Sequence, residues 1–301
     1  MLISHLEISN FRKLLSVRVD LAARTTLFVG ANNSGKTSAM LAMRRFLLGR
    51  KQHQFQLYDI TIAHWPALCQ IGRDWLTCEA NEQTPDLSME RWTPLLPAMD
   101  VWLAVSPSEL HFVSKLVPTL DWAGGLLGVR MRLEPADTEK FYKEFTRACA
   151  DVRAIKVVAA ASSSDEEEVE VGLWPSDMMD FLARRLSAHL TVRAYPLDPA
   201  GLIEPVKSVA KPQGLAPDTP ALEGDPLATL IRVNEIGAQR GFGEEQNLRD
   251  DDGALPSRSS SKLSEQLRSY YRKHLDPSEF PEPEDYGALR AIAAAPAASY
   301  T

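Results

Sequence analysis

The pattern that most constrains this chain is GANNSGKT at residues 30–37, which matches Gly-x-x-x-x-Gly-Lys-Thr. Glycines at both ends of such a loop allow backbone conformations in which successive N–H groups converge on one anion. A helix that starts directly after the loop brings the positive end of its dipole to the same place. The sequence therefore predicts a phosphate-binding loop. The simpler alternative is a Gly-rich turn from strand to helix with an incidental lysine.

The residues of this loop have different expected roles. We expect Lys36 to be the catalytic cation, in contact with the β- and γ-phosphates, and the Thr37 hydroxyl to ligate Mg²⁺. ATP and Mg²⁺ are the cofactors that the loop implies. The residues expected to bind the nucleotide in the loop and the first turn after it are Gly30, Ala31, Asn32, Asn33, Ser34, Gly35, Lys36, Thr37 and Ser38.

The segments on both sides of the loop have the apolar patterns that such a loop requires. Residues 25–30, TTLFVG, form a continuous apolar run and predict a strand buried on both faces. Residues 38–49 repeat apolar side chains at helical spacing and predict a helix that stops at Gly49. Upstream, residues 2–10 and 14–21 alternate apolar with polar side chains, which predicts two strands.

The rest of the chain gives a coarser prediction. Residues 51–98 carry only weak signals, and residues 205–226 are rich in Pro, Gly, Ala and Asp, which is typical of a loop or linker. The acidic run 165–168 is interpreted as a solvated turn between two strands. Further strands are expected over 100–105, 125–135 and 190–197, and helices over 137–152, from a cap at Ser176 onward, and over 262–275. We divide the chain into an ATP-binding lobe (1–200), a Pro/Gly-rich linker (201–228) and a helical region (229–301).

Charge and composition exclude some classes of protein. The whole chain has a net charge of -7, yet residues 1–50 hold eight Lys or Arg against two acids, a local charge of +6. A basic region of this kind fits contact with phosphates, and equally one phosphate-binding lysine among ordinary surface arginines. The three cysteines fit no zinc spacing, and no apolar run of membrane-spanning length exists. Without a secretory signal either, the sequence predicts a cytoplasmic protein with no membrane partner.

About the first 50 residues resemble the N-terminal lobe of ATPases of the SMC, RecF and OLD type. The matching motifs are Asn10-Phe11-Arg12 after the first strand and a loop of the form G-x-N-x-[SA]-G-K-[ST]. The resemblance implies an α/β fold: a P-loop NTPase lobe of the ABC/SMC-like class with a mixed β-sheet and a partial helical arm over 229–301. It also implies that Arg12 lies near the nucleotide, against the alternative of an exposed arginine at a strand turn.

Later segments are more similar to OLD-type ATP-dependent endonucleases than to the repair members. In those relatives, a segment like IGAQRGF joins the lobe to the arm, which implies that Gln239 and Arg240 lie near the γ-phosphate. The alternative is a loop whose arginine pairs with a local carboxylate.

Hydrolysis in these families needs further segments that the sequence lacks. We find no apolar strand ending in Asp-Glu (Walker B), no Ser-Gly signature segment and no acidic Toprim nuclease site. We therefore expect an N-terminal or truncated part of a DNA-associated ATPase, acting in DNA repair or phage defence. Its expected partners are DNA and either a second copy or a polypeptide that supplies the C-terminal ATPase half. The alternatives are a non-catalytic, nucleotide-sensing interaction module and, less favoured because of the N-terminal strands, a small-molecule P-loop kinase.

Overall fold

The structure is a computed structural model that describes residues 1–48, 54–114, 116–117, 122–162, 173–206, 209–216 and 219–233. The chain divides into two compact units, one of residues 1–150 with 175–233 and one of residues 151–174 with 234–301. The predictions for 262–275, for Gln239 and Arg240, and for the acidic run 165–168 all lie outside the described residues.

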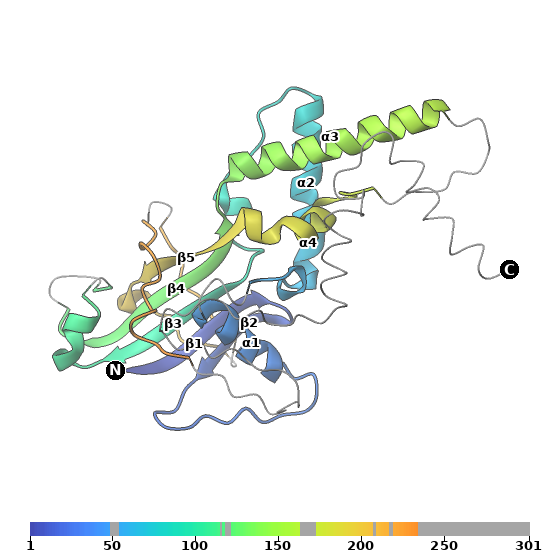
Figure 1. Cartoon of the computed structure of the whole chain (residues 1–301). Helices are drawn as coiled ribbons and strands as arrows, with labels where there is room; N and C mark the ends of the chain where they lie inside the picture. The colour runs from blue at the N-terminus through green and yellow to red at the C-terminus, as the bar shows by residue number, and fades with distance from the viewer. Residues whose placement is uncertain are drawn as a thin grey trace, which may run out of the picture. The chain divides into compact units, whose positions relative to one another are not determined.

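A five-stranded sheet forms the centre of this unit (Figure 1). Its strands follow the order β2-β1-β3-β4-β5, and every neighbouring pair is antiparallel. The strands are β1 (Leu2–Phe11), β2 (Leu14–Asp20), β3 (Ala98–Val105), β4 (Gly125–Pro135) and β5 (Leu190–Leu197). All five were predicted as strands, and those predictions are confirmed.

The prediction of a buried strand over residues 25–30 is wrong, and with it the prediction of a mixed sheet for the described part of the chain. This segment has no regular secondary structure and pairs with no strand there. Leu27 and Val29 are 80% and 87% exposed. An apolar run signals that a segment tends to be buried, but it does not supply the neighbouring strands that would bury it.

The two faces of the sheet differ in polarity. One face is apolar and buried, with residues such as Leu6, Val101 and Val129. The opposite face carries a row of polar side chains that the strand register aligns across the five strands. From β2 to β5 this row consists of Arg18, Glu7, Asp100, Arg130 and Tyr195.

The polar row is partly paired and partly covered. Arg130 donates two hydrogen bonds to the Asp100 carboxylate, from Nε and Nη2, both at 2.7 Å. Burial, with Asp100 adding to it, raises the pKa of Glu7 to about 7. The segment after β5 covers this face, because Ser16 Oγ donates to the Ala210 carbonyl at 2.7 Å.

Within the described ranges, four α-helices accompany the sheet: α1 (Lys36–Leu47), α2 (Trp65–Ala80), α3 (Thr138–Ser162) and α4 (Met178–His189). The helix expected over 38–49 is confirmed as α1. The helix expected over 137–152 is α3, which continues to Ser162, so the strand expected before the acidic run is wrong. The cap of α4 is Asp177 and not Ser176, because the Asp177 carboxylate accepts from the Asp180 N–H at 2.8 Å.

Short 3₁₀ helices connect these elements: η1 (Leu57–Asp59), η2 (Ile62–His64), η3 (Met89–Arg91), η4 (Pro107–Phe112) and η5 (Pro199–Gly201). Helix α2 was not predicted, since residues 51–98 gave only weak signals. None of the helices in the described part is both long and apolar enough to cross a bilayer.

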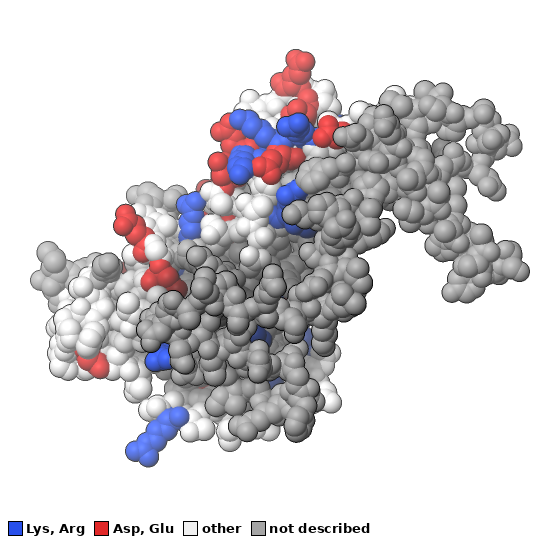
Figure 2. All heavy atoms as spheres, viewed as in Figure 1, with Lys and Arg blue, Asp and Glu red and all other residues white. Residues whose placement is uncertain are grey.

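The helices share an aromatic core centred on Trp75 of α2, which is fully buried. Its ring lies 5.3 Å from Phe141 of α3 and 5.7 Å from Trp92, centroid to centroid. Gly72 permits the close approach of α4, because a Cβ at this position would lie 3.0 Å from Met178 Cβ. Over the first turns of α3, acidic and basic side chains intermingle at the surface (Figure 2).

The described part of the second unit is small. It contains the end of α3 and residues 173–174, and Val152, Ile155 and Leu173 form a buried apolar cluster within it.

Candidate functional site

The turn between β1 and β2 forms one wall of the candidate site. It consists of Arg12 and Lys13, and it is flanked by left-handed backbone at Asn10 (φ 55°) and Arg12 (φ 53°). Asn tolerates this conformation, whereas a long side chain such as Arg seldom adopts it. The Arg12 N–H donates to the Asp59 carbonyl at 2.9 Å, which holds the turn in this shape.

Asp59 holds Arg12 through its side chain as well. Its fully buried carboxylate accepts from Arg12 Nε and from Arg45 Nε, both at 2.9 Å, and from the Gln56 N–H at 3.1 Å. The Arg12 guanidinium also lies 4.9 Å from the centroid of the Tyr58 ring. Arg12 is therefore fixed by ion pairing and stacking, and it is not the loosely exposed arginine of the alternative interpretation.

Asn10 joins the same turn to segments on both sides of α2. Asn10 Nδ2 donates to the Pro94 carbonyl at 2.9 Å, and Asn10 Oδ1 lies 2.9 Å from His64 Nε2. Because the amide oxygen only accepts, His64 Nε2 carries the proton in this contact. Burial lowers the pKa of His64, which favours the neutral ring.

The phosphate loop faces this turn. Its crest has left-handed backbone at Asn33 (φ 68°) and Gly35 (φ 97°), and α1 begins at Lys36 directly afterwards. A Cβ at position 35 would lie 3.0 Å from Leu14 Cδ2, so both the backbone angle and the space favour glycine there. The loop and the turn are thus packed against each other.

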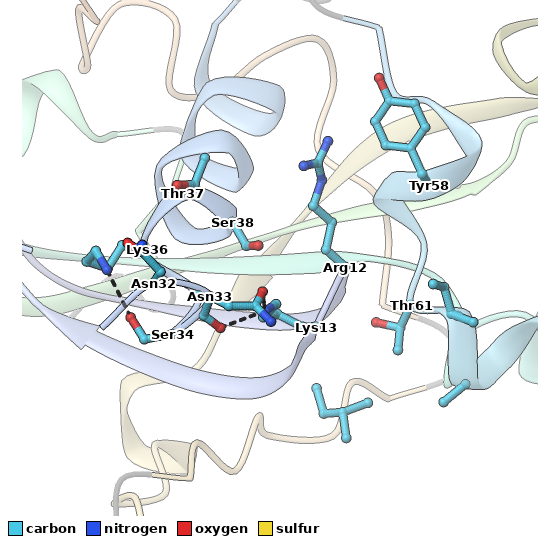
Figure 3. A pocket seen from close by; sticks show the side chains of 14 residues that line it. Arg12, Lys13, Asn32, Asn33, Ser34, Lys36, Thr37, Ser38, Tyr58 and Thr61 are labelled. Carbon is cyan, nitrogen blue, oxygen red and sulfur yellow. Dashed lines mark hydrogen bonds between the residues drawn. The ribbon is translucent and has the colours of Figure 1, made fainter. Parts of the chain in front are cut away.

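Two lysines contact the loop from different sides (Figure 3). Lys36 Nζ donates to the carbonyls of Gly30 and Ala31 at 2.7 and 2.6 Å, and to Ser34 Oγ at 3.2 Å. Lys13 Nζ donates to the Asn33 carbonyl at 2.6 Å and also to Asn33 Oδ1. All of these acceptors are neutral oxygens.

The turn, the loop and the start of α1 enclose a pocket with a volume of about 740 Å³. Of the predicted site residues, it is lined by Arg12 and by Asn32, Asn33, Ser34, Gly35, Lys36, Thr37 and Ser38. Gly30 and Ala31 lie outside the lining and contact the site through their carbonyls, which hold Lys36. The structure thus brings the predicted residues together, and their binding of a nucleotide stays a prediction.

Six further residues line the pocket that sequence reasoning did not single out: Lys13, Leu15, Tyr58, Thr61, Ile62 and Ala63. Lys13 directly follows the matched Asn-Phe-Arg segment, so its position in the chain was a usable signal. The segment 58–63 carries no motif, and only its contacts with the turn bring it to the site.

The charge of the pocket has one sign. Three lining side chains, Arg12, Lys13 and Lys36, are cationic, and none of the residues that line it is acidic. No cluster of three or more His, Cys, Asp or Glu that could hold a metal ion occurs in the described part of the chain. A pocket of this kind suits a polyanion better than a free divalent cation.

Comparison with known proteins agrees with this geometry. Residues 1–87 match the model of the AAA ATPase domain family, a range that contains β1, β2, the phosphate loop, α1 and α2. No curated protein matches the chain. The N-terminal region of this chain is therefore similar to AAA ATPase domains, and it lies within a unit of mixed α and β structure.

Proposed function

We propose that this chain binds Mg-ATP on residues 30–38, as the N-terminal part of an OLD- or RecF-like, DNA-associated ATPase. The observation that carries the proposal is the pocket of three cations and no acid, formed where the phosphate loop meets the start of α1. Backbone N–H groups at a helix start and lysine ammonium groups are the donors that a phosphate chain recruits. The AAA ATPase match over residues 1–87 supports the same nucleotide chemistry.

Mg²⁺ would reach this site with the nucleotide. Thr37 lines the pocket at the first turn of α1, and its hydroxyl is the protein ligand that the loop offers. Mg²⁺ commonly keeps several waters and binds to substrate phosphates with few protein ligands, which fits a site of this composition.

The direct test is nucleotide binding by the whole chain, measured by calorimetry with ATP in the presence of Mg²⁺. We expect Lys36→Ala to weaken ATP binding by at least about tenfold, the usual effect of losing a charge-assisted hydrogen bond. Lys140→Ala is the matched control, because Lys140 is an exposed lysine on α3 outside the pocket. Equal ATP affinity in the parent and in Lys36→Ala would remove the assignment.

A nucleotide-sensing module without catalysis is the second candidate. It is favoured by the absence of any carboxylate among the residues that line the pocket, because activation of the attacking water needs a general base. In the ATPase proposal, a second copy or a separate polypeptide supplies the missing base and signature segment. ATP turnover by the chain alone and mixed with the product of the neighbouring gene separates the two: turnover only in the mixture favours the split ATPase, and none in either favours the module.

The segment 25–30 is the surface that we propose for such a partner. Its Leu27 and Val29 side chains are exposed, and it leads directly into the phosphate loop. An exposed apolar segment outside any strand ladder is a place where another strand can pair. We further propose contact with DNA and a role in repair or phage defence, both of which rest on the resemblance. The proposed cytoplasmic location rests on the cysteine spacing and on the lack of a secretory signal in the sequence.

A further inference from the structure

We propose that Lys13 is a second phosphate ligand of this site, which binds the phosphate chain of a nucleoside polyphosphate together with Lys36. The inference rests on the proposed function and extends it to a residue outside the Gly-x-x-x-x-Gly-Lys-Thr pattern. Lys13 comes from the β1–β2 turn, 20 residues before Asn33, the loop residue that it contacts.

The first argument is the position of the ammonium group. Lys13 Nζ lies 2.6 Å from the carbonyl oxygen of Asn33, at the crest of the phosphate loop. Lys36 Nζ reaches the same loop from the other side, through Gly30 and Ala31 (Figure 3). An anion bound over the crest therefore lies between two ammonium groups.

The second argument is the chemistry of the two lysines' partners. Within the described ranges, neither Lys13 nor Lys36 forms an ion pair with a carboxylate, and each donates to neutral loop oxygens. Arg12 differs, because its guanidinium already pairs with the buried Asp59. In the part of the chain that the structure describes, Lys13 therefore resembles Lys36 as a lysine with no acidic partner, and a phosphate oxygen is a stronger acceptor than an amide oxygen.

The third argument is mobility of the contact. Lys13 is exposed and holds the loop only through its flexible end, so its ammonium group can exchange Asn33 for a phosphate oxygen without moving the backbone. A residue that only shaped the loop would act through Asn33, whose left-handed backbone it contacts. These two roles predict different results when Asn33 is replaced.

The experiment measures dissociation constants of the full chain for ATP with Mg²⁺ and for inorganic pyrophosphate, a probe without base or sugar. We expect Lys13→Met to weaken both about tenfold, the effect of one charge-assisted hydrogen bond, with the loss smaller at 1 M salt, where screening is strong. Lys13→Arg keeps the charge and should stay within about twofold of the parent. Lys140→Met is the control for removing an exposed lysine elsewhere, and it should bind like the parent.

The outcomes separate this inference from the proposed function. If the parent binds neither ATP nor pyrophosphate, both proposals fail. If the parent binds both and Lys36→Ala loses binding while Lys13→Met does not, only the assignment of Lys13 fails. Asn33→Gly relieves the left-handed backbone at position 33. If the double variant Lys13→Met/Asn33→Gly bound ATP as tightly as the parent, Lys13 would have a loop-shaping role, and its assignment as a phosphate ligand would be overturned.

Discussion

Asp59 joins the fold to the candidate site, and replacing it with asparagine tests that connection. The buried carboxylate accepts hydrogen bonds from Arg12, Arg45 and the Gln56 N–H. An asparagine amide has one accepting oxygen, and its NH₂ group would face donors at the other position. The Asp59→Asn variant therefore cannot keep all three contacts.

The exposure of the two arginines decides which contact is lost. The Arg45 side chain is 11% exposed and the Arg12 side chain 28%, so water can compensate Arg12 more easily. We expect the amide oxygen to stay with Arg45 and Gln56, and Arg12 to be released. Loss of a hydrogen bond to a charged group costs about 1.5–3 kcal/mol, and partial hydration of Arg12 places the expected loss near 2 kcal/mol. For a unit of this size that loss lowers the melting temperature by about 4–8 °C.

Urea unfolding followed by tryptophan fluorescence measures the change in the free energy of unfolding, and calorimetry with ATP measures the consequence for the site. Asp20→Asn is the matched control, because Asp20 carries an exposed ion pair with Arg18 and should change stability by less than about 0.5 kcal/mol. The reasoning about Asp59 would be refuted if Asp59→Asn lowered the free energy of unfolding no more than the control does. Unchanged ATP affinity in Asp59→Asn would refute the prediction that Arg12 contacts the nucleotide.

Three further predictions concern the sheet and the helical core. Burial and Asp100 raise the pKa of Glu7 from 4.5 to about 7, so folding favours the protonated acid and parent stability falls between these pH values. Urea titrations should therefore find Glu7→Gln more stable than the parent by about 3 kcal/mol at pH 8 and equal to it at pH 4. Gly128→Ala should cost about 1–3 kcal/mol in the same assay, because its Cβ would lie 2.8 Å from the Trp102 ring. Trp75→Ala should cost about 3–5 kcal/mol and lower the thermal midpoint, because a fully buried ring leaves a cavity.

The strands of the sheet were predictable because alternation of apolar and polar residues is itself the pattern of a sheet with unlike faces. In β1, Leu6 and Ile8 are fully buried on one face while Glu7 belongs to the polar row. Their order and direction were not predictable, since the pairing of β1 with β3 joins residues about 90 positions apart. The mixed sheet was implied by the family resemblance, and the apolar run 25–30 was expected to be one of its strands.

Helix α2 shows a different reason for a missed element. Its buried residues Leu68, Ile71 and Trp75 do recur at helical spacing, but they stand in a segment rich in Trp and Pro that also reads as irregular chain. Pro66 falls at the start of the helix, where proline is tolerated, and not within it. The Trp75 ring of this helix packs against Phe141 of α3. That contact joins residues far apart in the chain, so a local sequence pattern could not predict it.

The candidate site was predictable where chemistry requires particular residues at fixed spacing. Gly35 must adopt a positive φ, and Lys36 follows it at the start of the helix, so the loop is evident from the sequence. Arg12 was predicted from the resemblance. The structure shows that Asp59, 47 residues further along, holds its side chain, and its contact with a nucleotide stays a prediction. Tyr58 and Ile62 reach the pocket only through such long-range contacts.

The exposed segment 25–30 has a thermodynamic consequence for the loop that it precedes. Downstream, the loop continues into the packed helix α1. Upstream, it is connected to residues 25–29, which form no strand pairing within the described residues. Any polypeptide that pairs with this stretch would restrain the loop before a phosphate arrives, and a bound phosphate would restrain the stretch before the polypeptide arrives. Linkage requires the two effects to be equal, so the factor by which a partner tightens ATP binding is the factor by which ATP tightens the partner.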